Sequence, residues 1–104
     1  MKDKEGSFAV LYRWRVKEGS ENAFAKAWLE VTDNFLKNFG SLGSRLHKGN
    51  DGLYYAYAVW PSREARDQAF FDSQLESAAE SMRETSVERL PEIELEIVAD
   101  RLKH

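Results

Sequence analysis

The sequence predicts an α+β domain of the ferredoxin-like type, with the element order β-α-β-β-α-β. Three observations predict it. Residues 8–17 and 92–102 alternate between apolar and polar side chains, as half-buried strands do. Residues 20–40 repeat apolar side chains at helical spacing, and residues 40–65 are typical of a β-hairpin that leads into a helix. The predicted sheet is four-stranded and antiparallel, with its helices on one face.

Composition limits the class of protein. The 104 residues are enough for one domain, expected over 8–104 after a flexible N-terminus at 1–7. With no cysteine, thiolate catalysis and thiolate metal sites are excluded. A net charge of -3, with 15 basic and 18 acidic residues, favours neither nucleic acid nor a membrane as partner. The start M-K-D-K-E-G-S lacks the apolar core of a signal peptide, so a cytoplasmic location is expected.

The first strand is predicted to have one fully apolar face and one face that becomes basic. The apolar face carries Phe8, Val10, Tyr12, Trp14 and Val16. On the other face Arg13 and Arg15 follow Ala9 and Leu11. Both faces therefore need a partner, and we expect the apolar one to face the helices.

The first helix is predicted between Ser20, a suitable N-cap, and Gly40, a natural stop in the left-handed conformation. Its apolar stripe is rich in aromatic residues: Phe24, Ala27, Trp28, Val31, Phe35 and Phe39. Aromatic side chains bury large areas and dominate cores, so we interpret the stripe first as packing against the sheet.

The hairpin turns at Gly49-Asn50-Asp51-Gly52 and continues into an aromatic third strand that ends at Pro61. One of two sets must face the helices, either Leu53, Tyr55, Tyr57 and Val59 or Tyr54, Ala56, Ala58 and Trp60. We favour the second set. Its two alanines between large rings leave room either for an aromatic-lined pocket or for interdigitated core side chains.

The last third predicts a helical pair and a fourth strand. Ser62 can cap the first short helix, and Ser73-Gln74-Leu75-Glu76 matches a capping box for the second. Residues 87–91 are expected as a loop and 92–102 as the strand. Its acidic face, with Glu94 and Glu96, is expected opposite Arg13 and Arg15.

The uncovered face of the predicted sheet is too apolar for water. It is expected to carry Leu11, Tyr55, Tyr57, Val59 and Val98. A sheet face of this kind needs a cover, and we predict that a second copy of the chain supplies it. The expected assembly is a homodimer that closes into an α+β barrel.

Two segments carry a family resemblance: Y-R-W-R-V-K-E-G-S-E-N-A-F at 12–24 and S-R-L-H-K-G-N-D-G-L-Y-Y-A-Y-A-V-W-P-S-R-E-A at 44–65. Over about 9–71 the chain resembles the antibiotic biosynthesis monooxygenase family of dimeric α+β barrel proteins. The resemblance implies a homodimer with a pocket between sheet and helices in each subunit. Members oxidise phenolic or quinone-forming polyketides with O₂ and without metal or flavin, degrade haem, isomerise or cleave small quinols, or have no known activity.

Within that resemblance, Trp60 in W-P-S-R-E-A matches a tryptophan that commonly lines the pocket. Tyr12, Trp14, Trp28 and Tyr54 are expected to line it as well. Haem degradation is disfavoured, because the first strand lacks the asparagine, and 70–82 lacks the histidine, of the haem-degrading members. No cofactor and no metal are expected.

Three residues are candidates for catalysis. His47 could accept a phenol proton, since His104 is terminal, and Arg13 and Arg45 could hold a phenolate or carboxylate. Each has a structural alternative, because His47 and Arg45 can face the dimer interior and Arg13 can pair across strands. No serine triad, phosphate loop or metal-ligand spacing is recognisable.

The sequence thus predicts a cofactor-independent monooxygenase-like protein acting with O₂ on a small aromatic or phenolic molecule. The alternative is a non-catalytic dimeric domain that binds a small hydrophobic metabolite. A helix-side cavity of about 300 Å³ or more, containing Trp60 and an ionisable group, would favour catalysis. A filled core would favour the alternative.

Overall fold

The structure, a computed structural model, describes residues 8–72 and 76–102. Its elements are β1 (Phe8–Val16), α1 (Glu21–Asn38), β2 (Gly43–Lys48), β3 (Tyr54–Trp60), α2 (Arg63–Asp72), α3 (Glu76–Thr85) and β4 (Ser86–Glu96). The predicted α+β order is confirmed, with the second helical region split into α2 and α3. The predicted flexible N-terminus, the start of the capping box at Ser73, and His104 lie outside the described residues.

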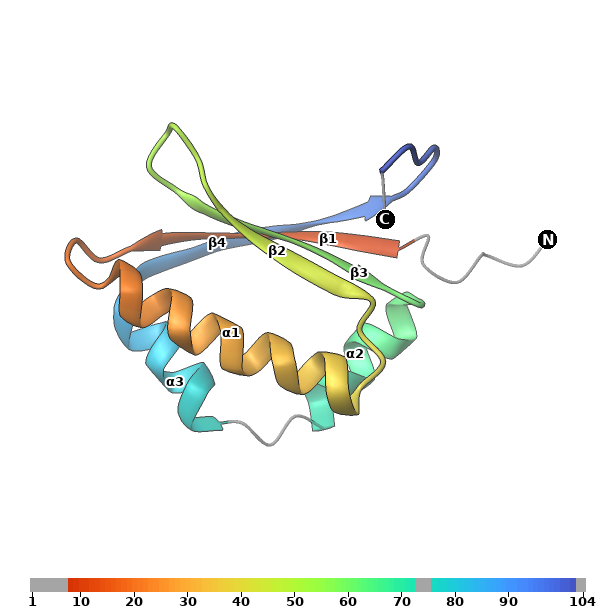
Figure 1. Cartoon of the computed structure of the whole chain (residues 1–104), viewed down its shortest axis with the longest axis horizontal. Helices are drawn as coiled ribbons and strands as arrows, with labels where there is room; N and C mark the ends of the chain where they lie inside the picture. The colour runs from red at the N-terminus through yellow and green to blue at the C-terminus, as the bar shows by residue number, and fades with distance from the viewer. Residues whose placement is uncertain (1–7, 73–75, 103–104) are drawn as a thin grey trace.

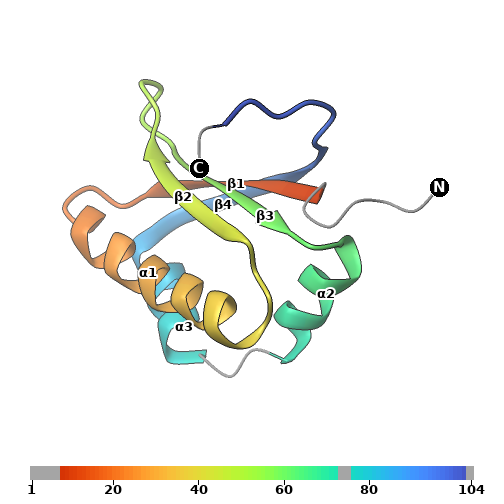
Figure 2. The same cartoon turned by 45° about the vertical axis from the view of Figure 1, so that its right-hand side comes forward.

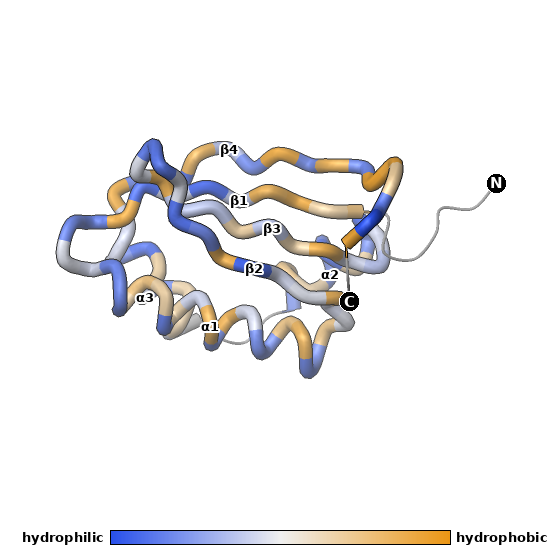
Figure 3. Tube along the Cα trace, turned by 45° about the horizontal axis from the view of Figure 1, so that its top comes forward, coloured by the Kyte–Doolittle hydropathy of each residue, from blue (hydrophilic) through white to orange (hydrophobic). Residues whose placement is uncertain are grey.

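The four strands form one antiparallel sheet in the order β2-β3-β1-β4, as in ferredoxin-like folds (Figure 3). All three helices cover the same face of this sheet (Figures 1 and 2). Pairing of Val10 with Ala58, and of Ala56 with Leu46, fixes which side chains point to the helices. The preferred set on β3 is confirmed, since Ala56, Ala58 and Trp60 are buried on the helix side.

Local chemistry explains the boundaries of these elements. Gly40 ends α1 with a φ of 77°, a conformation that glycine adopts without strain. The Asp51 side chain accepts the Leu53 N–H in the hairpin turn, and the Ser62 hydroxyl accepts the Ala65 N–H at the start of α2. Ser20 occupies the N-cap position of α1 but makes no side-chain capping bond.

The fourth strand begins earlier than the sequence suggested. The prediction of a loop at 87–91 and a strand at 92–102 was wrong, because β4 starts at Ser86 and ends at Glu96. Pro91 is tolerated because β4 is an edge strand, and the register shifts between Leu11 and Arg13. The Arg13 guanidinium binds the Pro91 carbonyl at 3.2 Å and 2.7 Å.

This register also overturns the predicted pairing of Arg13 and Arg15 with Glu94 and Glu96. Glu94 lies opposite Val10 and Glu96 opposite Phe8. Arg15 instead pairs with Glu88, at 3.2 Å. The acidic face of β4 turns toward the helices, where arginines of α2 meet it.

No helix in the part of the chain that the structure describes covers the opposite face of the sheet. Leu11 of β1 lies there beside Tyr57 of β3, and Ile93 of β4 lies on its other side. After β4 the chain leaves the sheet on this same side (Figure 1). Among the described residues, no helix is both long and apolar enough to cross a bilayer.

Candidate functional site

A cavity of about 390 Å³ lies between the sheet and the helices. It is lined by Tyr12, Trp14, Trp28, Val31, Thr32, Phe35, Ser41, Ser44, Ala58, Trp60, Phe70, Ala79, Met82, Arg83, Ser86 and Arg89. All three tryptophans of the chain belong to this wall. The volume is within the range of small-molecule sites. The helix side is therefore not a filled core.

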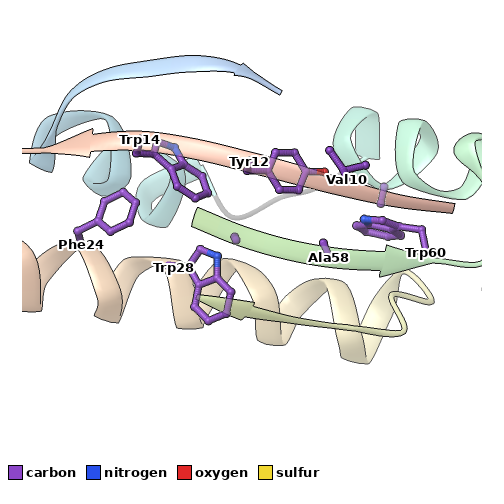
Figure 4. Close-up of a cluster of buried hydrophobic side chains, with 9 residues drawn as sticks. Val10, Tyr12, Trp14, Phe24, Trp28, Ala58 and Trp60 are labelled. Carbon is purple, nitrogen blue, oxygen red and sulfur yellow. The ribbon is translucent and has the colours of Figure 1, made fainter. Parts of the chain in front are cut away.

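Small side chains on the sheet leave this space open. Tyr12 and Trp14 project from β1 toward the helices, and Trp28 projects from α1 toward the sheet (Figure 4). Ala58 of β3 also lines the cavity, and its short side chain leaves room above the sheet. Tyr54 does not line the cavity, since its ring packs edge to face on Phe24 at 5.8 Å.

Trp60 contributes an unused hydrogen-bond donor. The side chain is 2% exposed, and its indole Nε1 has no hydrogen-bond partner among the described residues. The ring nitrogen lies on the edge of the indole that is nearer to Ala58 (Figure 4). A buried N–H without a partner costs about 1–3 kcal/mol, and an acceptor brought within reach of it would recover that free energy.

Tyr12 is held as a neutral phenol. Burial raises the pKa of Tyr12, and the Arg66 guanidinium, which donates to its oxygen at 3.4 Å, opposes that shift only in part. Because the oxygen accepts from Arg66, the hydroxyl proton is free for another acceptor. Tyr12 can donate a hydrogen bond into the cavity and cannot serve as a base at neutral pH.

Arg66 is the centre of an ionic network behind Tyr12. It is 6% exposed and pairs with Asp67 at 2.8 Å, Glu92 at 2.7 Å and Glu94 at 3.0 Å. Burial alone would lower the pKa of Arg66, but its bonds to Tyr12 and Asp67 outweigh burial and raise it. The guanidinium also lies 5.4 Å from the ring centre of Phe70, a cavity residue. The network ties α2 to β4 beside the cavity.

The structure divides the predicted site residues between the two faces of the sheet. Arg45 pairs with Tyr57 and His47 with Tyr55, and these positions point away from the helices. Arg13 lies on that same face, bound to the Pro91 carbonyl. None of the three lines the cavity, so none can touch a molecule held there.

Sequence reasoning missed the polar groups that the cavity does contain. Arg83 and Arg89 line it, and neither was among the candidate site residues. Arg66 went unnoticed, although it shares a helix face with Ala69 and Phe70, at spacings of three and four residues. A charged residue within an apolar helical stripe is a sign of a buried charge, and this pattern could have identified Arg66. No comparable signal marked Arg89, because 87–91 was expected to be a loop.

The raised pKa of Tyr12 predicts a loss of stability in alkali. Above about pH 10 the unfolded chain releases the Tyr12 proton while the folded chain retains it, so unfolding becomes more favourable. The stabilising contribution is complete below about pH 10 and is lost as the pH rises through the folded value. Urea unfolding between about pH 9 and 11 should therefore show a steeper decline for wild type than for Tyr12→Phe. An equal decline in the free energy of unfolding for the two proteins would contradict this prediction.

Among the described residues, no group of three histidine, aspartate or glutamate side chains could hold a metal ion. The lining residues of the cavity likewise include no histidine and no carboxylate. What the site offers is aromatic surface, two neutral donors on Trp60 and Tyr12, and two guanidinium groups. Such a set can orient an aromatic molecule and stabilise negative charge on it.

Comparisons with known proteins agree with this architecture. Residues 7–80 match the family model of antibiotic biosynthesis monooxygenase. No curated protein sequence matches the chain.

Three solved structures with the same fold cover nearly the whole chain. A Bordetella bronchiseptica protein assigned to these monooxygenases is 16% identical, with 91% of this chain and 100% of that one covered and a TM-score of 0.78. The corresponding Caulobacter crescentus protein is 19% identical, with coverage of 91% and 92% and a TM-score of 0.77. SnoaB, a cofactor-independent oxygenase from Streptomyces nogalater, is 18% identical, with coverage of 92% and 94% and a TM-score of 0.73. At these identities the likeness concerns the fold alone.

Proposed function

Because this chain belongs to the antibiotic biosynthesis monooxygenase family, we propose that it oxidises a small aromatic or phenolic molecule with O₂, without a cofactor, in the helix-side cavity. The observation that carries the proposal is the buried N–H of Trp60, a residue that lines that cavity; this N–H has no partner among the described residues. A phenolic oxygen is an acceptor of the right kind for it.

The aromatic wall would bind and orient the ring of the substrate. Trp14, Trp28 and Phe35 supply flat apolar surface, and Trp60 and Tyr12 supply donors for an oxygen on the ring. Such donors bind a phenolate more strongly than a phenol, because hydrogen bonds to charged acceptors are about twice as strong as neutral ones. The site therefore favours the anion, which is the form that reacts with O₂.

Ionisation of the substrate would depend on the field of the site and not on a side-chain base. The described lining residues contain Arg83 and Arg89 but no histidine or carboxylate. Nearby cations lower the pKa of a bound phenol, and its proton can leave to solvent. Phenols that are already acidic in water should be the better substrates.

For a substrate with a ring CH₂ group, such as an anthrone, the chemistry balances without an added reductant. Conversion of a ring CH₂ to C=O removes four electrons and two protons from the substrate carbon, if one oxygen atom of O₂ enters the product. The other oxygen atom leaves as water with those two protons. The substrate thus supplies every electron that O₂ requires, and the protein supplies orientation, exclusion of water and charge stabilisation.

Oxygen uptake tests the proposal. Purified protein should consume O₂ above the rate of autoxidation with at least one member of a panel of hydroquinones and anthrones, and Trp60→Phe should slow that reaction. Binding in a calorimetric titration without O₂ uptake would support the alternative, a non-catalytic domain for small hydrophobic metabolites. If no compound of the panel binds, both functions fail for this class of ligand.

The homodimer belongs to the same proposal. The helix-free face of the sheet carries Leu11, Tyr55, Tyr57 and Val59, and a second copy placed there would remove their apolar surface from water. Arg45 and His47 would then lie inside the resulting barrel. Sedimentation velocity should give about twice the 12.0 kDa of one chain. A monomer at micromolar concentration would contradict this part.

Filling the cavity from the sheet side should weaken binding at little cost in stability. Ala58 lines the cavity, whereas Ala56, two residues earlier on the same face, is fully buried in the core. Ala58→Leu places its added atoms in open space, so we expect stability within about 1 kcal/mol of wild type and at least about tenfold weaker binding of 2-naphthol. Ala56→Leu overpacks the core and should cost about 1–3 kcal/mol.

Urea denaturation and a fluorescence titration measure both effects, since all three tryptophans border the cavity. The cavity would be the wrong binding site if Ala58→Leu retained wild-type affinity.

A further inference from the structure

Polar side chains are present at both ends of the cavity. At one end Ser44 of β2 lies opposite Ala58, which in turn lies opposite Val10 of β1. At the other end Arg89 of β4 lies opposite Trp14. Val10 and Trp14 are four residues apart on one strand, which is about 13 Å along its axis. A ligand that reaches both ends must therefore be elongated.

The two ends differ in charge. The described lining residues near Trp60 are neutral hydroxyl donors, Ser41 and Ser44. At the β4 end Arg83 and Arg89 line the wall, with Ser86 between them in the chain. No described lining residue is a carboxylate, although the chain as a whole carries a net charge of -3.

Arg83 is the cation available to a ligand. Arg89 is already engaged, because it pairs with Glu92 at 3.0 Å and lies 5.5 Å from the ring centre of Tyr12. Arg83 makes no ion pair with any residue that the structure describes. Its carbonyl accepts a hydrogen bond from the Ser86 hydroxyl at 3.2 Å, which fixes the backbone of this corner against the start of β4.

We propose that the cavity takes aromatic acids, with the phenolic oxygen at the Trp60 end and the carboxylate at the Arg83 end. This inference rests on the proposed function of the cavity and adds the substrate class. A guanidinium presents parallel N–H groups that match the two oxygens of a carboxylate, and it stays charged at every physiological pH.

A structural role for Arg83 predicts a different outcome. Arg83 lies in the last turn of α3, where a cation stabilises the helix through its dipole. That role would make a neutral variant less stable without changing the preference of the cavity among ligands. Ligand selectivity therefore separates the two roles.

The test uses two probes that share one ring system and one hydroxyl group, 6-hydroxy-2-naphthoate and 6-hydroxy-2-naphthamide. Calorimetric titration at neutral pH should show the acid binding wild type about tenfold more tightly than the amide. Arg83→Gln should remove this preference by weakening the acid, with the affinity for the amide unchanged within about twofold. Arg83→Lys should retain part of it.

Arg101→Gln is the matched control, because Arg101 is exposed and does not line the cavity. It should leave the preference intact, and thermal melts should show that each variant is folded. If wild type binds both probes equally, or Arg83→Gln weakens both alike, the inference is overturned while the proposed function stands. If neither probe nor 2-naphthol binds wild type, the proposed function fails and the inference fails with it.

Discussion

Replacing Arg66 with methionine is expected to lower the free energy of unfolding by about 2–4 kcal/mol. The nearly buried guanidinium joins Tyr12 of β1 to Glu92 and Glu94 of β4, and Arg66→Met leaves both carboxylates without it. The expected loss is somewhat smaller than the roughly 3–5 kcal/mol that breaking a fully buried ion pair costs. The reason is that the Glu92 and Glu94 side chains are 29% and 34% exposed, so water replaces part of the interaction.

Two matched variants sharpen this prediction. Arg63 also pairs with Glu94, but its own side chain is 55% exposed, so Arg63→Met should cost no more than about 1 kcal/mol. Arg66→Lys retains the charge without the planar fork and should fall between wild type and Arg66→Met. Chemical denaturation of the four proteins measures the order. A wild-type stability for Arg66→Met would show that the network does not hold α2 on the sheet.

The faces of the sheet could be predicted from the sequence because a strand has a period of two. Once Val10, Tyr12 and Trp14 were placed toward the helices, the small residues on β3 determined the rest. Alanines can lie under a helix without filling the space, whereas Tyr55 and Tyr57 would have filled it. The same alternation places His47 opposite Tyr55, away from the cavity. That placement required the register of β2, which the hairpin turn alone did not fix.

The start of β4 could not be predicted, because Pro91 suggested a loop where the structure has a strand. Pro91 lacks an N–H and usually ends a strand, yet on an edge strand its missing donor faces no partner. Nor does the sequence reveal that the register shifts beside Tyr12. With that shift Glu92 and Glu94 face the helices and Arg66, instead of lying opposite Arg13. The aromatic wall of the site was therefore predictable, but its charges were not.

Trp60 provides the largest expected effect on stability. Trp60→Ala removes the largest fully buried side chain and should cost about 3–5 kcal/mol. Its ring packs edge to face on Phe35 at 5.3 Å and on Phe70 at 6.4 Å, so the loss also loosens the cavity wall. This variant is expected to bind 2-naphthol weakly for structural reasons alone, and it cannot isolate the N–H group.

Trp60→Phe isolates that group. It keeps an aromatic ring against Phe35 and removes a buried donor that has no described partner, so the lost volume and the relieved desolvation act in opposite directions. We expect stability within about 1.5 kcal/mol of wild type. Affinity for 2-naphthol should nevertheless fall about two- to tenfold, which corresponds to the net contribution of one hydrogen bond to the free energy of binding. Paired urea denaturation and calorimetric titration measure the two effects separately. If affinity stays at the wild-type value, the Trp60 N–H does not bind the phenolic oxygen, and the observation that carries the proposed function is lost.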